Sequence, residues 1–344
     1  MNQNYIGENS CDTLSWQSNH RPLISIIMAN QRIGRSILLI VIALGFTQEL
    51  KGSPNFIRQS EQPRVEFETI NKNLEHLYIT ENVNALIGLY VESFTFFPEY
   101  KTAILDIDTL RKFFTSWFTA ADFKKYKKTI YAIEGYSDYL LEMGAFQMEY
   151  SVADIESKYE GHYMILWKRD ENGRLRVVSE IFGANKYLDP KDVPYANVKL
   201  MGSESMPKID TSNLIYAEVL EFDAVLLKAV ADGDGDARAR GFTNDAILMS
   251  NFDSIRVGMK AIRPKMLSTY NKNVSFNVKH TYFQMYALGE YVFVTSHYKG
   301  GWGDESSGGR FEGNMANLLK RTDKGNLLMH RQAGNRDSEL VIVD

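Results

Sequence analysis

The amino-acid sequence predicts an α+β protein made of two related domains in tandem. Three observations support this: similar blocks recur 152 residues apart, each half places helical periodicity before strand-like segments, and loop-forming residues separate the halves. At 344 residues the chain is long enough for two ordinary domains. We expect an N-terminal segment at 1–63, a first domain at 64–188, a linker at 189–211, a second domain at 212–338 and a tail at 339–344.

Matching blocks mark both ends of the repeat. The stretch 242–250 occupies the place of 90–98, and Glu312-Gly313 and Lys320-Arg321 repeat Glu160-Gly161 and Lys168-Arg169. Between them Gly144 matches Gly289 at a separation of 145, so we expect the second repeat to lose seven residues there. It would regain them in the glycine-rich stretch 300–309, which would then be a loop, where length changes are tolerated.

Each repeat is expected to begin with helices and to end with strands. Apolar spacing predicts a first helix over 67–78 and 219–230, and capping residues start a second one at Asn82 and Asp234. A short apolar strand and a third helix follow, at 94–97 and 110–118, and at 246–249 and 259–267. The remaining predicted strands are 129–133, 145–150, 159–167 and 175–182, then 274–280, 291–298, 311–319 and 326–332. Turns at Gly173 and Gly325 predict hairpins, so about three helices should pack on one curved antiparallel sheet per domain.

Composition excludes several kinds of function. The net charge of −4 and the pI near 6.0 give no basic face for a nucleic-acid partner. The single cysteine, Cys11, precedes both domains, so disulfides, thiolate metal sites and cysteine nucleophiles are not expected within them. Because no HxH or HExxH spacing occurs either, we expect no metal and no cofactor.

The N-terminal segment bears on location. Arg32 and Arg35 precede the apolar run 37–46, which has the form of a secretory signal peptide and is too short to span a bilayer comfortably. We therefore expect a secreted or periplasmic protein, translated from Met1 or Met28, with membrane contact only through this segment if it stays uncleaved. The alternative is a buried helix in a cytoplasmic protein.

The order of elements and several short motifs resemble the superfamily of ketosteroid isomerase, scytalone dehydratase and SnoaL-type polyketide cyclases, which is also called nuclear-transport-factor-2-like. The residues that carry the resemblance are Gly233-Asp234, the stretch 242–246, Glu312-Gly313, Lys320-Arg321 and the stretch 325–327. It implies two tandem cone-shaped domains, each with a pocket between the helices and the concave sheet face. This fold hosts enzymes, binding proteins and assembly domains, so it does not define a reaction.

The resemblance does not imply isomerase activity, because the positions that match the isomerases' catalytic residues hold other residue types. By the resemblance, the general base falls at Pro98 and Ser250, which cannot abstract a proton at neutral pH. The oxyanion tyrosine falls at Leu74 and Leu226, and the protonated aspartate at Ile165 and Asn317.

In the second domain the resemblance implies an inward-facing set of polar residues. His297 and His330 are the candidate general acid or base, and Asn317 could stabilise an oxyanion. Thr295, Gln332 and Trp302 are candidate ligand-binding residues. The alternative is that these are ordinary polar residues at a pocket mouth, with Trp302 on a lid or at a hairpin tip.

The first domain has a more aromatic interior. Its candidate ligand-binding residues are Tyr163, Trp167 and Glu180, although aromatic core packing would explain the first two equally. A carboxylate facing such an interior would have a raised pKa unless it is paired, and Tyr163 could hydrogen-bond to Glu180. Alternation along the strand places His162 on the opposite face, where we expect it to be exposed.

Together these observations predict an exported protein that binds a small, mostly apolar organic molecule, mainly in the second domain. One alternative is a cofactor-free isomerase, dehydratase or hydrolase that uses the pocket histidines. Another is a non-catalytic dimerisation or interaction module, because the outward residues Met164, Leu166, Ala316 and Leu318 are apolar. They favour sheet-to-sheet packing between the domains or in a homodimer.

Overall fold

The computed structural model describes residues 61–196, 198, 209, 211–304, 307–338 and 341–343. Cys11, the signal-peptide-like run 37–46 and much of the linker lie outside the described residues. Both repeats fall within a single compact unit. None of the helices in the described part of the chain combines the length and apolar character needed to cross a bilayer.

The first repeat packs three helices on a five-stranded sheet. Its elements are α1 (Glu61–Ile79), α2 (Val83–Ile87), β1 (Tyr90–Phe97), α3 (Ile107–Ala120), β2 (Asp122–Tyr136), β3 (Tyr139–Val152), β4 (Ile155–Arg169) and β5 (Leu175–Ala184), with a 3₁₀ turn, η1, at Pro190–Asp192. The strand order is β1-β5-β4-β3-β2, antiparallel except for the parallel pair β1 and β5.

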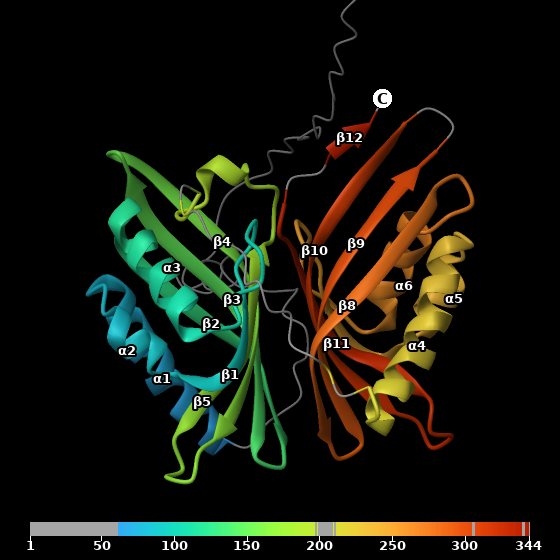
Figure 1. Cartoon of the computed structure of the whole chain (residues 1–344), viewed down its shortest axis with the longest axis horizontal. Coiled ribbons are helices and arrows are strands. Elements are labelled where there is room, and N and C mark those ends of the chain that lie inside the picture. The colour runs from blue at the N-terminus through green and yellow to red at the C-terminus, as the bar shows by residue number, and fades with distance from the viewer. Residues whose placement is uncertain are drawn as a thin grey trace, which may run out of the picture. The chain divides into compact units, whose positions relative to one another are not determined.

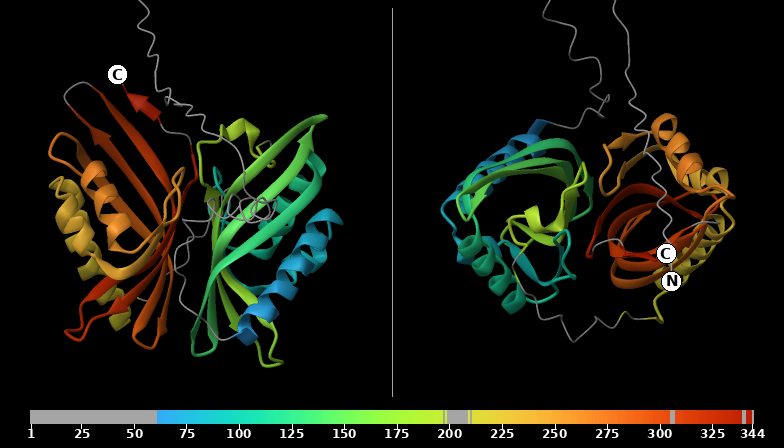
Figure 2. Two further views of the ribbon diagram at one scale, coloured as in Figure 1. Left: turned by 180° about the vertical axis from the view of Figure 1, so that it is seen from behind. Right: turned by 90° about the horizontal axis from the view of Figure 1, so that it is seen from above.

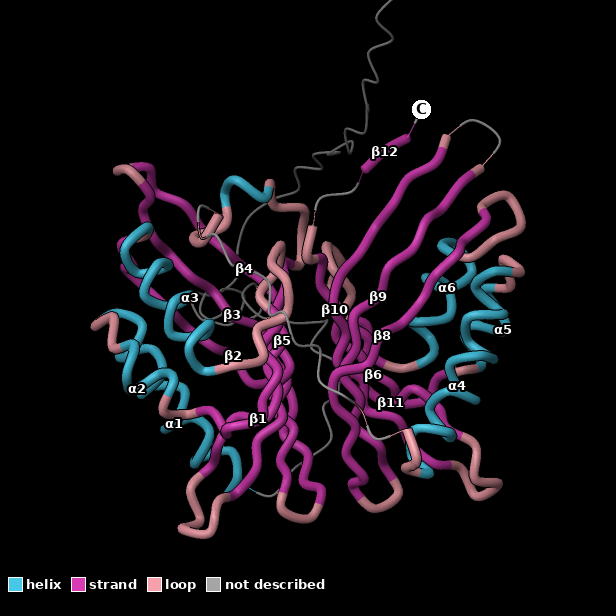
Figure 3. Tube along the Cα trace, in the orientation of Figure 1, coloured by secondary structure: helices cyan, strands magenta, loops and turns pink. Residues whose placement is uncertain are grey.

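The second repeat follows the same plan (Figures 1 and 3). Its elements are α4 (Leu214–Ala231), α5 (Gly235–Arg240), β6 (Phe242–Met249), β7 (Arg256–Val257), α6 (Met259–Thr269), β8 (Ser275–Leu288), β9 (Tyr291–Gly303), β10 (Gly308–Arg321), β11 (Leu327–Arg336) and β12 (Val341–Val343). Seven strands form its sheet in the order β7-β6-β11-β10-β9-β8, with β12 beside β10. The prediction of two tandem α+β domains is confirmed.

The repeat spacing is constant, which corrects the expected gap. Tyr139 and Tyr291 begin β3 and β9, and Arg169 and Arg321 end β4 and β10, both 152 positions apart. Gly289, with a φ of +69°, therefore corresponds to Ser137 in the turn before β3, which has a φ of +55°, and not to Gly144. The glycine-rich stretch is consequently not an inserted loop, because β9 runs to residue 303 and β10 starts at 308.

The false match arose because two glycines serve different purposes. Gly144 lies within β3, where an added Cβ would meet the Thr129 carbonyl oxygen at 2.1 Å. Gly289 instead provides the left-handed conformation of a hairpin turn, with open space around it. The identity of the residue is shared, but its structural role is not.

The second helix of each repeat starts where a side-chain cap satisfies a free backbone N–H group. Asn82 accepts a hydrogen bond from the Ala85 N–H (3.1 Å) and Asp234 accepts one from the Ala237 N–H (2.8 Å). Both predicted starts of the second helices are thus confirmed.

Three buried apolar clusters hold the unit together. Each repeat has a helix-facing core between its helices and its sheet. A third cluster, here called the inter-sheet core, joins the opposite faces of the two sheets, while the helices lie on the outer sides (Figure 2). Its buried members are Phe97, Leu141, Met143, Met164, Leu166, Val178, Ile181, Ile247, Met249, Phe283, Leu288, Phe293, Ala316, Leu318 and Ala333.

Polar groups also connect the two sheets. The Asn335 side-chain amide donates to the carbonyl oxygens of Phe97 and Phe182, each at 2.8 Å. His162 is only 1% exposed, so the expectation of an exposed histidine is wrong. Alternation had placed it on the correct face, but the second sheet covers that face. Burial lowers the pKa of His162 to about 4, so the ring is neutral at pH 7.

Candidate functional site

The second repeat contains a cavity of about 490 Å³, larger than the others described below. It lies between α4, α5 and the turn that leads into β11, and we call it the α4–α5 pocket. Its lining residues are Glu218, Glu221, Phe222, Val225, Leu226, Ala229, Ala237, Arg238, Arg240, Gly241, Gly325, Asn326, Leu327 and Leu328. A volume of this size accommodates a small organic molecule.

Arg238 is the unusual residue of this pocket. It lies on α5, is 5% exposed, and its Nε and Nη1 atoms have no hydrogen-bond partner. Its guanidinium carbon lies 4.6 Å from the centre of the Phe242 ring. Burial lowers the pKa of Arg238, whereas a hydrogen bond with Tyr270 and the charge of Asp223 act against that shift. A buried cation with free donors is costly unless an anion compensates it.

Two charged residues that line the pocket, Glu218 and Arg240, are paired. Glu218 accepts from Arg321 Nε and Nη2, at 3.1 and 2.7 Å, and Arg240 pairs with Asp236 at 3.1 Å. Among the described residues that line the pocket, Arg238 is therefore the cation left with buried free donors.

A smaller cavity, of about 380 Å³, occupies the equivalent place in the first repeat. Several of its lining residues, including Glu66, Ile70 and Leu175, lie 152 positions before lining residues of the α4–α5 pocket. The position equivalent to Arg238 holds Leu86, which is 2% exposed. The two cavities therefore share a location but not a buried charge.

A buried polar group lies deeper in the second repeat. Asp223 of α4 accepts a hydrogen bond from the Tyr282 hydroxyl at 2.7 Å, and its other oxygen is 2.8 Å from His280 Nδ1. No sequence pattern singled out Arg238 or these three residues. One residue in the sequence did indicate a buried polar group: Asp223 is a carboxylate within the apolar stretch of α4.

The predicted catalytic set is not assembled on one face. Val292 and Val294 belong to the helix-facing core and Phe293 to the inter-sheet core, so alternation puts Thr295 and His297 on the inter-sheet side. The false glycine match caused this error, because a shift of seven residues is odd and an odd shift inverts the faces of a strand. By the same alternation, Trp302 is on the helix side near the end of β9.

The remaining predicted residues of this domain have local partners. Asn317 Oδ1 accepts from Gln332 Nε2 at 3.2 Å, so these two amides do lie together. His330 is 4% exposed, with Nδ1 3.0 Å from the Thr243 hydroxyl, at an irregularity in the pairing of β11. Burial, with a smaller effect of Arg331, lowers the pKa of His330 to about 4, which makes it a weak base.

The predicted residues of the first domain belong to two separate hydrogen-bonded groups, one around Glu142 and one around Glu180. Tyr163 and Trp167 donate to Glu142, at 2.8 and 3.1 Å, not to Glu180. Glu180 accepts from the Tyr90 hydroxyl at 2.5 Å, and burial raises its pKa. The cavity that Glu180 lines holds only about 10 Å³, roughly one water molecule, because aromatic side chains fill the interior.

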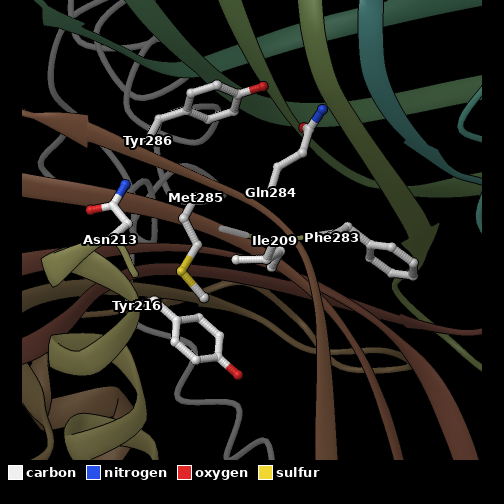
Figure 4. A pocket seen from close by; sticks show the side chains of 7 residues that line it. All are labelled: Ile209, Asn213, Tyr216, Phe283, Gln284, Met285 and Tyr286. Atoms are coloured by element: carbon white, nitrogen blue, oxygen red, sulfur yellow. The ribbon is translucent and has the colours of Figure 1, made fainter. Parts of the chain in front are cut away.

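A further pocket of about 200 Å³ lies beside β8 (Figure 4). Met285 and Tyr216 point toward each other there, whereas Gln284 and Tyr286 extend toward the strands of the first repeat. Gln284 Nε2 donates to the Ser93 carbonyl oxygen at 3.1 Å, so this side chain is used in the contact between repeats. None of the seven lining residues is charged, and the pocket offers no comparable anchor.

No family model matches the chain, and no curated protein matches it. Among solved structures, the chain is similar to a ketosteroid isomerase-like protein from Erwinia carotovora atroseptica, with 19% identity over 37% of this chain and 99% of that one, at a TM-score of 0.33. It is also similar to an NTF-2 like protein of unknown function from Shewanella oneidensis, with 16% identity over 36% and 99% of the two chains and a TM-score of 0.31. ActVI-ORFA from Streptomyces coelicolor is 15% identical over 36% of this chain and 98% of its own, with a TM-score of 0.33.

Proposed function

We propose that the second repeat binds a small, mostly apolar organic anion, such as a carboxylic acid, in the α4–α5 pocket. The observation that carries the proposal is the guanidinium of Arg238, which lines a cavity of about 490 Å³ and whose buried Nε and Nη1 atoms have no hydrogen-bond partner. A carboxylate would accept from these donors and neutralise the charge, since the planar guanidinium matches its geometry.

Apolar side chains would bind the body of the ligand. Phe222, Leu226 and Leu327 belong to the helix-facing core or pack against it, and each also lines the pocket. Burial of ligand carbon against such side chains gains about 25 cal/mol per Å². The proposal therefore predicts a preference for acids with an extended hydrocarbon part over formate or acetate.

A catalytic role for His297, His330 and Asn317 is not part of this proposal. Residues that act together in catalysis must reach the same reacting group, and here His297 and Asn317 lie on opposite faces of the sheet. Binding without turnover is the function that the described contacts support.

Calorimetry with decanoate and decanamide tests the proposal, because the two probes share a hydrocarbon chain and differ in charge. We expect decanoate to bind wild-type protein roughly ten- to hundred-fold more tightly than decanamide, as a charge-assisted hydrogen bond contributes about 1.5–3 kcal/mol. Arg238→Met should abolish the preference, and Arg64→Met, at an exposed arginine of α1, should keep it. Equal affinities for both probes, or an unchanged preference in Arg238→Met, would refute the anion site.

Export is a separate proposal that rests on the apolar run 37–46 and the arginines before it. Intact-mass measurement of the protein recovered from the periplasm or medium of the expressing cells would test it. A mass that retains the run, or recovery only from the cytoplasm, would contradict it.

A further inference from the structure

Three side chains of types that can bind metal ions meet on the sheet of the second repeat. His297 comes from β9, Glu312 from β10, and Asp337 directly follows β11. One donor atom from each lies within 4.8 Å of the other two. His297 Nε2 is 2.8 Å from Asp337 Oδ2 and 4.0 Å from Glu312 Oε2.

Backbone pairing fixes these three positions. In the register of β9 and β10, His297 lies opposite Asn314 and Lys299 lies opposite Glu312, so alternate residues bring the histidine and the glutamate to one face. The Asp337 N–H donates to the Glu312 carbonyl oxygen at 3.4 Å, which ties the third residue to β10. The donors thus come from three adjacent chain segments that the sheet holds together.

The burial of Asp337 is an independent observation that points to a ligand at this place. The Asp337 side chain is 7% exposed, and its Oδ1 atom is buried without a hydrogen-bond partner. Desolvating a carboxylate oxygen is unfavourable unless a donor or a cation compensates it. His297 and Glu312, with side-chain exposures of 23% and 34%, leave the group accessible to an ion from solution.

We propose that His297, Glu312 and Asp337 bind a divalent transition-metal ion of the Zn²⁺ class. A neutral imidazole and two carboxylates balance the charge of such an ion, and water would complete its coordination. Bonds of about 2.0–2.2 Å place neighbouring donor atoms roughly 3.0–3.5 Å apart, so the 2.8 and 4.0 Å separations need only small side-chain adjustments. The imidazole nitrogen disfavours Mg²⁺ and Ca²⁺, which prefer oxygen ligands alone.

Lys299 competes with the ion. Its Nζ lies 3.1 Å from Glu312 Oε2, and its side chain is 70% exposed. Metal binding must displace this ammonium group from the glutamate, which weakens the site. The affinity is therefore expected to rise when the lysine loses its charge.

The site is independent of the α4–α5 pocket. His297 is on the inter-sheet side of its strand, whereas that pocket lies among the helices on the other side. Failure of either proposal leaves the other intact.

Isothermal titration of the untagged full chain with ZnCl₂, after removal of metal by EDTA and dialysis, tests the site. We expect one equivalent to bind, with a Kd on the order of micromolar, and MgCl₂ to give no comparable signal. His297→Gln and Asp337→Asn should each weaken binding at least about ten-fold. Lys299→Met should tighten it, and His76→Gln, at an exposed histidine of α1, should match wild type.

Circular dichroism would establish that each variant is folded. Asp337→Asn keeps the shape of the side chain, and Lys299→Met changes an exposed residue, so we expect both variants to fold. They test the site even if His297→Gln misfolds. The proposal is overturned if wild-type protein takes up no Zn²⁺ at concentrations up to about 1 mM, or if Asp337→Asn and Lys299→Met both bind it as wild type does.

Discussion

Arg331 of β11 donates two hydrogen bonds, from Nε at 3.0 Å and Nη2 at 2.6 Å, to the same carboxylate oxygen of Glu134 on β2. The pair joins the sheet of one repeat to the sheet of the other. Arg331 has a side-chain exposure of 1% and Glu134 of 14%, so solvent screens the interaction little. The Arg331 Nη1 also donates to the Asp245 carbonyl oxygen at 2.8 Å, which fixes the guanidinium within its own repeat.

Glu134→Gln should destabilise the protein strongly, because it leaves a buried guanidinium without its counter-ion. We expect a loss of about 3–5 kcal/mol in the free energy of unfolding, measured by urea denaturation. Glu68→Gln, which breaks the exposed pair with Arg64, is the matched control and should cost under about 1 kcal/mol. Equal losses in the two variants would show that the inter-sheet pair contributes no more than a surface pair.

Glu99 makes the stability depend on pH in an unusual direction. Its carboxylate is fully buried and accepts hydrogen bonds from the Tyr159 hydroxyl (2.6 Å) and the Ala184 N–H (2.9 Å), but burial dominates and raises its pKa from 4.5 to about 7. The folded state therefore holds the proton that the unfolded state releases. Its contribution is present below pH 4.5 and is lost as pH rises to about 7.

Glu99→Gln should remove that loss. From pH 5 to pH 8 we expect the variant to gain roughly 3 kcal/mol of stability relative to wild type, as each pKa unit corresponds to about 1.4 kcal/mol. Urea denaturation at both pH values measures this difference, and comparing the two proteins cancels groups they share, such as His162. A difference that stays the same at both pH values would contradict the raised pKa.

The Lys128–Glu142 pair in the first repeat should act as one unit. Lys128 Nζ lies 3.3 Å from Glu142 Oε2, and the side chains are 1% and 0% exposed. Lys128→Met removes the only charge of opposite sign contacting this buried glutamate among the described residues, so a loss of about 3–5 kcal/mol is expected. Adding Glu142→Gln should recover part of it, because the amide carries no charge. Additive losses in the double variant would argue against coupling.

Arg238 should reduce stability in the absence of ligand. Replacing it by Leu, the residue at the equivalent position in the first repeat, removes a buried cation with free donors and leaves the pocket apolar. We expect thermal unfolding of Arg238→Leu to occur at a temperature equal to or above that of wild type, while decanoate no longer raises it. A large destabilisation would show that contacts within the protein already satisfy Arg238.

Local patterns in the sequence were sufficient to predict the order of helices and strands. Capping residues marked the starts of α2 and α5, and the glycines at positions 173 and 325 have the positive φ of 76° and 84° that their hairpin turns require. The strand lengths were harder to predict. β2, for example, covers Asp122–Tyr136, much more than the predicted 129–133, because its polar residues follow no clean alternation.

Local sequence patterns did not predict most of the candidate site, because contacts between distant parts of the chain form it. Which face of β9 meets the helices depends on register, and one odd misalignment moved Thr295 and His297 to the wrong side. Arg238 carries no periodic signal in a six-residue helix, and its burial depends on α4 and the distant start of β11. The three proposed metal ligands have no sequence spacing of their own, because the sheet brings them together.

Because the two repeats are covalently linked, the inter-sheet core needs less binding free energy to keep the two sheets together than it would between separate subunits. Two sheets on one chain meet at an effective concentration on the order of millimolar, so their association should withstand dilution that would separate free subunits. A contact within one chain also escapes the self-complementarity that a two-fold symmetric dimer imposes. Arg331 and Glu134 illustrate this freedom: the positions 152 residues away hold Ser179 and Tyr286, so the ion pair exists once and has no mirror copy.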